Sequence, residues 1–347
     1  MNTTCRISPR RYRLAATLTA LLAILGCQDD LTSPRGPETE AAEASLAQAS
    51  NTWIARAPLP KSSDGLALSG FVVGAAPNSA GDWFAYIFGG DDGEESQSIT
   101  RRYNVETNTW GAGSGSSPNA TVMNGVGKIG NRLYMTGGGR CCRGDEPIYN
   151  QTWAYDIGTG RLFQKANLPR ATTDGVTGVI DGKLYVLAGF CSGEPTDPGH
   201  CSVGGPVRQF YRYDPATNTW ILRRQPPHFH TRGAGAVING KFYVVGGGPS
   251  PSNQLDVYDP VSNTWTTRAP IPTGGTVFSA AVIQNRMFVV LWSMIDGKTK
   301  AYSYDPVSNT WRSRAAPPKF NPIVRVQLDG QARLFMPGNG SSYMYAP

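Results

Sequence analysis

The sequence is poor in charge, in histidine and in apolar segments with helical spacing. Only 16% of its 347 residues are charged, and three are histidines. Beyond the N-terminal region, no long apolar run repeats at the period of a helix, which disfavours a helical fold. The sequence also lacks a nucleophile elbow, a phosphate-binding loop and a zinc-protease motif. The enzyme classes that these motifs mark are therefore not supported.

Glycine and aromatic residues are abundant instead. The chain has 41 Gly, 8 Trp, 15 Tyr and 12 Phe, a composition typical of short strands joined by tight turns. The net charge is +7, but four arginines belong to the N-terminal segment discussed next. Without them, 28 basic and 25 acidic residues remain, which is too balanced to indicate nucleic-acid binding.

The first 26 residues have the pattern of a signal peptide. A basic segment that ends at Arg13 precedes 13 mostly apolar residues, too few to cross a bilayer. The sequence Ile-Leu-Gly-Cys that ends at Cys27 resembles the bacterial lipobox, although Leu25 is larger than the usual residue there. We expect acylation of Cys27, and Gln28 favours an outer-membrane address in the cell envelope. The alternative is an ordinary secretory leader with an incidental cysteine.

Residues 27–50 are polar and rich in alanine, with Pro34 and Pro37 among them. Such a composition cannot bury a core, so this segment is predicted to be a flexible tether. At about 3.3 Å per residue it would extend over at most roughly 75 Å.

The remaining chain, 51–347, repeats a segment of eight residues that runs from Tyr to Trp. Its copies begin at Tyr103, Tyr155, Tyr213, Tyr258 and Tyr304 and end at Trp110, Leu162, Trp220, Trp265 and Trp311. A partial copy ends at Trp53, and the successive end positions are 57, 52, 58, 45 and 46 residues apart. Within the segment, Asp-Pro and Asn-Thr favour a turn, because proline sets φ and asparagine tolerates the left-handed region.

Each repeat also contains an apolar strand that ends in small residues, as in Tyr-Ile-Phe-Gly-Gly at 86–90 and Tyr-Val-Val-Gly-Gly at 243–247. Glycines allow close approach of neighbouring backbones and positive φ. The fifth copy, 288–292, has lost its glycines.

Gly-Gly after an apolar strand, followed by Tyr and then Trp, resembles the kelch repeat. The resemblance implies an all-β, six-bladed β-propeller over 51–347. The chain starts with a Trp strand and ends with a Tyr strand, Tyr343–Tyr345. We therefore expect the Trp53 strand to pair with this last strand and close the ring without free edges.

In kelch proteins the loops after the glycines and after the Trp strand share one face, which commonly binds ligands. Here these loops carry six candidate ligand-binding residues: Arg140, Arg170, Asp174, His228, His230 and Arg232. Their arginines could bind an anionic sugar or a peptide carboxylate, because guanidinium groups offer two parallel donors. Each of them could equally be a solvated surface residue.

Four cysteines fall in the same loops, and an exported protein meets an oxidising compartment. We favour a structural disulfide between Cys191 and Cys201, which would stabilise the fold by roughly 2–3 kcal/mol. Cys141 and Cys142 allow a vicinal pair or pairing across the loops. Metal thiolates and free thiols are the alternatives.

The sequence predicts neither a metal nor a cofactor. A His-x-His pattern such as His228 and His230 suits a metal, but partly exposed loop residues explain it as well. Galactose oxidase, a copper enzyme on a kelch-type ring, needs a Tyr-His pair in sequence, and this chain has none.

The favoured hypothesis is a monomeric, non-catalytic binding module that is tethered to a membrane and displays its loop face to a protein or glycan. The alternative is an exported carbohydrate-active enzyme of the kelch type, such as a sugar mutarotase or epimerase. Only the analogy of fold supports this alternative.

Overall fold

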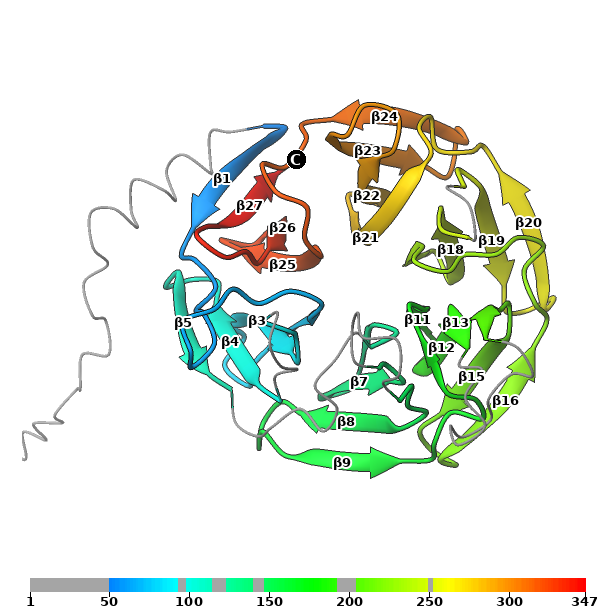
Figure 1. Ribbon diagram of the computed structural model, residues 1–347, viewed down its shortest axis with the longest axis horizontal. Coiled ribbons are helices and arrows are strands. Elements are labelled where there is room, and N and C mark those ends of the chain that lie inside the picture. The colour runs from blue at the N-terminus through cyan, green and yellow to red at the C-terminus, as the bar shows by residue number, and fades with distance from the viewer. Residues whose placement is uncertain (1–49, 93–97, 114–122, 140–146, 192–203, 249–251) are drawn as a thin grey trace, which may run out of the picture. The chain divides into compact units, whose positions relative to one another are not determined.

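The computed structural model describes residues 50–92, 98–113, 123–139, 147–191, 204–248 and 252–347 (Figure 1). The chain divides into two units, Met1–Gly36 and Pro37–Pro347, and all described residues belong to the second. The elements of these residues are all β-strands, and among them no helix has the length and apolarity needed to cross a bilayer. The predicted signal peptide, the acylation of Cys27 and nearly all of the tether lie outside the described residues and remain predictions.

The described strands form six antiparallel sheets of four strands and one small sheet of three. The first three large sheets are β2(Val72–Pro77)–β3(Trp83–Phe88)–β4(Thr100–Asn104)–β5(Thr109–Ala112), β6(Val126–Ile129)–β7(Arg132–Thr136)–β8(Thr152–Asp156)–β9(Leu162–Lys165) and β11(Val176–Ile180)–β12(Lys183–Leu187)–β15(Phe210–Asp214)–β16(Thr219–Arg223). The next two are β17(Ala234–Ile238)–β18(Lys241–Val245)–β19(Leu255–Asp259)–β20(Thr264–Arg268) and β21(Gly275–Ile283)–β22(Arg286–Ser293)–β23(Thr299–Asp305)–β24(Thr310–Arg314). The last is β25(Val324–Leu328)–β26(Gln331–Met336)–β27(Ser342–Ala346)–β1(Thr52–Arg56). The small sheet contains β10(Thr172–Thr173), β13(Phe190–Cys191) and β14(Gly205–Pro206).

The large sheets follow one another around a common centre (Figure 1). The first strand of each is innermost, because all six contribute residues to the wall of the central cavity. Contacts join β2 to β6, β6 to β11, β11 to β17, β17 to β21, β21 to β25 and β25 to β2. This is the arrangement of a kelch-type β-propeller, so the expected all-β fold is confirmed, and each large sheet is called a blade below. In the blade that contains both ends of this region, β1 pairs with β27, and Trp53 lies opposite Tyr345 with ring centroids 5.1 Å apart.

Strand direction alternates within a blade, so the connections lie on two faces. The turns between the first and second strands and between the third and fourth strands form the turn face. The connections after the second strand and between blades form the loop face. The small sheet of β10, β13 and β14 belongs to connections of the loop face.

Each Tyr-to-Trp segment joins its blade to the preceding one. In the turn after β19, Asn263 has a φ of 56°, and its Oδ1 accepts hydrogen bonds from the Tyr258 hydroxyl at 2.9 Å and from the backbone N of Arg224 at 3.2 Å. The indole Nε1 of Trp265 donates to the carbonyl oxygen of Arg224 at 2.7 Å. We call this set the Tyr-Asn-Trp clamp. The asparagine of the turn therefore holds the neighbouring blade as well as its own turn.

The clamp recurs with asparagines 51, 108, 218 and 309. In the β6–β9 blade the repeat carries Gly160 and Leu162 instead, and these side chains have no hydrogen-bonding group. Leu162 still occupies the position opposite Tyr155, as the sequence predicts. This blade therefore keeps an apolar residue opposite its tyrosine but lacks the hydrogen bonds of the clamp.

Glycines in the innermost strands let neighbouring blades approach. A Cβ added at Gly127 of β6 would lie 2.5 Å from Cδ1 of Leu184 and 2.8 Å from Cγ2 of Val179, both of the next blade. At the end of β7, Gly137 has a φ of 59° and leads the chain out of the sheet.

The β21–β24 blade departs from this rule, because Leu291 and Trp292 replace the two glycines. Side chains that avoid positive φ keep the backbone extended, so β22 has eight residues, whereas β18 has five. A bulge between Val277 and Ser279 shifts the register of its partner β21. The loop-face end of β22 consequently extends farther than the corresponding ends of the other second strands do.

Candidate functional site

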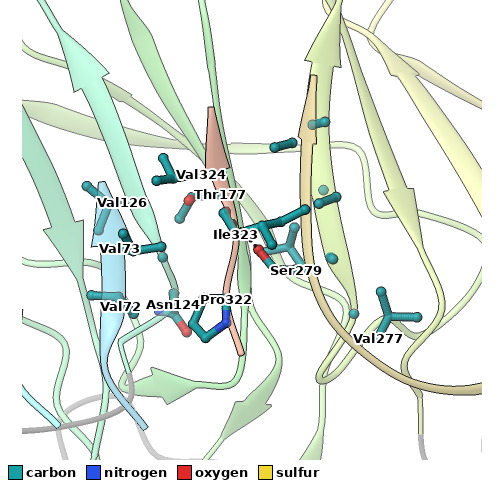
Figure 2. A pocket seen from close by; sticks show the side chains of 18 of the residues that line it. Val72, Val73, Asn124, Val126, Thr177, Val277, Ser279, Pro322, Ile323 and Val324 are labelled. Atoms are coloured by element: carbon teal, nitrogen blue, oxygen red, sulfur yellow. Dashed lines mark hydrogen bonds between the residues drawn. The ribbon is translucent and has the colours of Figure 1, made fainter. Parts of the chain in front are cut away.

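A cavity of about 730 Å³ lies between the innermost strands. Strands β2, β6, β11, β17, β21 and β25 all contribute lining residues (Figure 2). Figure 2 shows that valines supply much of the wall, including Val72, Val126, Val277 and Val324. A volume of this size and a mostly apolar wall are typical of small-molecule sites.

One repeat position faces the cavity in all six blades. Counted from the repeat tyrosines, the strand registers make these six residues equivalent: Val73, Val126, Thr177, Gly235, Ala280 and Ile323. All six line the cavity and are small or apolar. Arg325, two residues farther along β25, also lines the cavity, and it is a charged and exposed side chain. The sequence analysis did not select Arg325; alignment of the repeats by strand register places it with Val237 and Val282, which line the cavity as well.

Asp174 and Arg232 lie where the cavity opens to the loop face, in the connections before β11 and β17. Both have left-handed backbone, with φ of 55° and 59°, and the backbone N of Arg232 donates to the Asp174 carbonyl at 2.9 Å. Nε of Arg232 lies 3.5 Å from Oδ2 of Asp174, and the side chains are 71% and 21% exposed. Burial raises the pKa of Asp174, and the Arg232 charge offsets part of that effect. Two of the predicted residues thus share one site.

Asn124 braces the same opening from the connection before β6. Its Nδ2 donates to Oγ1 of Thr172 at 2.9 Å, and its Oδ1 accepts from the backbone N of Gly175 at 3.0 Å. The side chain is buried, so these bonds fix the backbone on both sides of Asp174.

Two histidines of the loop face, His228 and His230, converge on Asp256 of β19, a residue that the sequence analysis did not single out. Nε2 of His230 lies 3.1 Å from Oδ2 of Asp256, and Nδ1 of His228 lies 3.0 Å from the same atom. Oγ1 of Thr267 donates to Oδ1 at 2.8 Å. Asp256 and His230 are fully buried, whereas the His228 side chain is 39% exposed.

The contacts of this cluster set the pKa of Asp256 and occupy the His230 ring. Nδ1 of His230 lies 2.7 Å from the Gly246 carbonyl oxygen, which only accepts, so Nδ1 is the donor of this hydrogen bond. Burial raises the pKa of Asp256, but the hydrogen bonds from His230 and Thr267 and the His230 charge outweigh it, so the pKa lies below its usual value. Both ring nitrogens of His230 thus lie within hydrogen-bonding distance of protein oxygen atoms, and neither is open to a metal.

No group of three or more metal-ligating side chains with suitable geometry occurs among the described residues. Neither His228 nor His230 is part of the cavity lining. The cluster instead anchors the connection before β17, which carries Arg232, onto its blade.

The comparisons with known proteins agree with this architecture. The family model of the KLHDC2/KLHL20/DRC7 Kelch-repeats domain matches residues 76–290, well over half of the chain. The chain belongs to the Kelch-repeat family. It is also similar to the Kelch-like protein terF of Aspergillus terreus, at 29% identity over 122 residues. That match covers 34% of this chain and 25% of the relative, so this chain aligns with only a quarter of that relative's length.

Arg170 does not line the cavity of this Kelch domain. Its guanidinium hydrogen-bonds the Tyr211 hydroxyl, and its Nη1 lies 3.6 Å from Sγ of Cys191. Cys191 is buried and disulfide-bonded. Its predicted partner Cys201, together with Cys141, Cys142 and Arg140, lies outside the described residues. The pairing therefore stays a prediction.

Apolar side chains are exposed on the loop face of the Kelch blade that lost its glycines. Trp292, Met294 and Ile295 are 38%, 59% and 79% exposed, and we call them the apolar tip. The Trp292 ring lies 6.2 Å from that of Phe320. Thr276, which pairs with Trp292, lines the cavity, so the tip stands beside its opening. Sequence analysis concentrated on the polar loops and missed this surface; the loss of the glycines was the available signal.

Proposed function

We propose that this protein is an interaction module, tethered to the cell envelope, that binds a protein partner through its loop face. Kelch repeats suggest a protein-interaction module, which supports the general class. The observation that carries the proposal is the apolar tip of Trp292, Met294 and Ile295. Exposed groups of large apolar side chains are typical of surfaces that are covered by a partner.

We further propose that the propeller is a complete ring of six blades. The contacts between successive innermost strands and the pairing of β1 with β27 support this proposal. Closure leaves only the short outer strand of each blade as an edge, which limits edge-to-edge association between copies.

The point where the tether joins the ring supports a loop face that is free to bind. Asn51 occupies the clamp position that other asparagines take in turns of the turn face. The described chain therefore starts at the turn face, so a tether to Cys27 need not cover the cavity opening. Loss of palmitate labelling on Cys27→Ala would support this anchor, and labelling that survives the substitution would refute it.

Photo-crosslinking at matched positions tests the partner. A benzoylphenylalanine at position 295 replaces Ile295 in the apolar tip. The same residue at position 261 replaces Val261, which is 95% exposed but lies in the turn after β19, on the turn face. We expect a discrete protease-sensitive adduct from position 295 in intact cells, and none from position 261.

Two further results would decide the test. Trp292→Ala should weaken the adduct from position 295, because the tip would lose its largest apolar surface. Equal crosslinking from both positions, or an adduct that a glycosidase removes and a protease does not, would contradict a protein partner.

We do not propose the enzyme alternative. Of the residues on which it depends, Arg232 lies beside the Asp174 carboxylate in the cavity lining. His228 and His230 are engaged with Asp256, away from that lining. Arg140 lies outside the described residues. The described lining therefore holds a carboxylate and an arginine but no histidine beside them, and no observation favours a particular reaction.

A further inference from the structure

Arg325 is a long charged side chain in the wall of the cavity. The neighbouring blades carry Ala75 and Val282 at the equivalent position, so the packing of the repeat does not require such a side chain there. In the part of the chain that the structure describes, its guanidinium makes no hydrogen bond or ion pair. Because this guanidinium is exposed at an apolar wall and has no partner among the described residues, it is available to pair with the anionic group of a ligand.

The charges of the cavity wall show the sign of that partner. The lining contains three charged residues, Asp174, Arg232 and Arg325. Asp174 lies beside Arg232, and these two charges offset each other. The positive charge of Arg325 remains, so the cavity as a whole carries one uncompensated positive charge.

The remainder of the wall shows the nature of the ligand's body. Apart from the charged residues, the lining is dominated by valine, glycine and alanine, with the Asn124 amide and the hydroxyls of Thr177, Thr276 and Ser279. The Ser279 hydroxyl donates to the Ile323 carbonyl oxygen at 3.1 Å. Such a wall favours an apolar ring or chain over a sugar, whose many hydroxyls would lose their hydrogen bonds to water.

We propose that the central cavity binds a small monoanionic organic acid with an apolar body. Its carboxylate pairs with Arg325, whose guanidinium can donate two parallel hydrogen bonds to the two carboxylate oxygens. Its body contacts the valine and alanine side chains of the inner strands. This site is separate from the apolar tip, so it does not depend on the proposed protein partner.

Calorimetric titration of the purified protein with cyclohexanecarboxylate tests the site. Cyclohexanecarboxamide has the same shape without the charge, and inorganic phosphate has the charge without the apolar body. We expect saturable binding of the carboxylate and at least tenfold weaker binding of the other two. Arg325→Gln should weaken carboxylate binding by about 10- to 100-fold, because it removes a charge-assisted hydrogen bond.

Arg312→Gln is the matched control, since Arg312 is exposed on the outer strand β24 and should leave the affinity unchanged. Arg325→Lys keeps the charge and should retain part of the affinity. Unfolding midpoints of all variants establish that the fold persists. No carboxylate binding, equal affinity of wild type and Arg325→Gln, or equal binding of carboxamide or phosphate would overturn the proposal. Crosslinking from position 295 would be unaffected by any of these results.

Discussion

Replacing Asn51 by glycine tests whether the clamp between the first and last strands stabilises the propeller. Oδ1 of Asn51 accepts hydrogen bonds from the Tyr345 hydroxyl at 2.9 Å and from the backbone N of Ala315 at 3.0 Å. Each such bond contributes about 0.5–1.5 kcal/mol, so the loss of both should cost about 1–3 kcal/mol. Glycine adopts the φ of 53° without strain, but it gains entropy in the unfolded chain, which costs about 0.5–1 kcal/mol more.

Asn285→Gly separates the two contributions. Asn285 has a φ of 56°, close to that of Asn51, and its side chain makes no hydrogen bond to the described residues. Its replacement should therefore cost only the entropic part. Asn51→Ala should be about 1 kcal/mol less stable than Asn51→Gly, because a Cβ is disfavoured in the left-handed region.

Urea unfolding followed by tryptophan fluorescence, with the slope and the midpoint both fitted, measures these differences. Asn218→Gly removes the corresponding bonds from Tyr213 at 2.7 Å and Ala166 at 2.9 Å, within one continuous part of the chain. In a closed ring the losses at Asn51 and Asn218 should be equal within about 0.5 kcal/mol. If Asn51→Gly matches Asn285→Gly while Asn218→Gly is clearly less stable, the pairing of β1 with β27 does not stabilise the ring and the reasoning is refuted.

Three further predictions concern the loop face and the inner strands. Asp256→Asn should lower the free energy of unfolding at pH 7 by about 2–3 kcal/mol, because an amide replaces the buried carboxylate that accepts from the Thr267 hydroxyl and contacts the His230 ring. The pKa of Asp256 in the folded protein lies below its usual value, so the stability that the carboxylate contributes is complete above about pH 4 and is lost as the pH falls further. The difference in free energy of unfolding between wild type and Asp256→Asn should therefore narrow at pH 3, and a difference that stays constant with pH would contradict the pairing. Arg232→Gln should raise the pKa of Asp174 further in an NMR titration of its carboxyl carbon, and an unchanged value would show that the 3.5 Å contact is weak in solution. Gly127→Ala should destabilise the fold by about 1–3 kcal/mol in thermal unfolding, because the added Cβ would lie 2.5 Å from Leu184 of the next blade. A variant as stable as wild type would show that the two blades can move apart at no cost.

Much of the fold could be predicted because its signals are local. The segment from Tyr258 to Trp265 contains the proline, the asparagine and the spacing that make its turn. Repetition of the segment predicted a propeller, because blades of one period pack side by side. The prediction for the degenerate copy was also confirmed, because Leu162 lies opposite Tyr155.

The candidate site was predicted only in part. The loops that hold Asp174 and Arg232 were identified, and the structure places these residues together. His228 and His230 were selected as ligand candidates, but both contact Asp256, which lies on a strand and had no distinguishing pattern. Pairings between side chains of different elements depend on the register and twist of strands, which local composition does not specify.

The sequence by itself determined the strands, the turns and the length of the repeat, because proline, glycine and asparagine restrict φ within a few residues. Only the tertiary structure decided that Arg325 faces a cavity and that Trp292 lies exposed beside its opening. A cavity exists only when six strands, separated by up to about 250 residues of chain, surround one axis. Its contents are therefore a property of the assembled blades, whereas each turn is a property of its own segment.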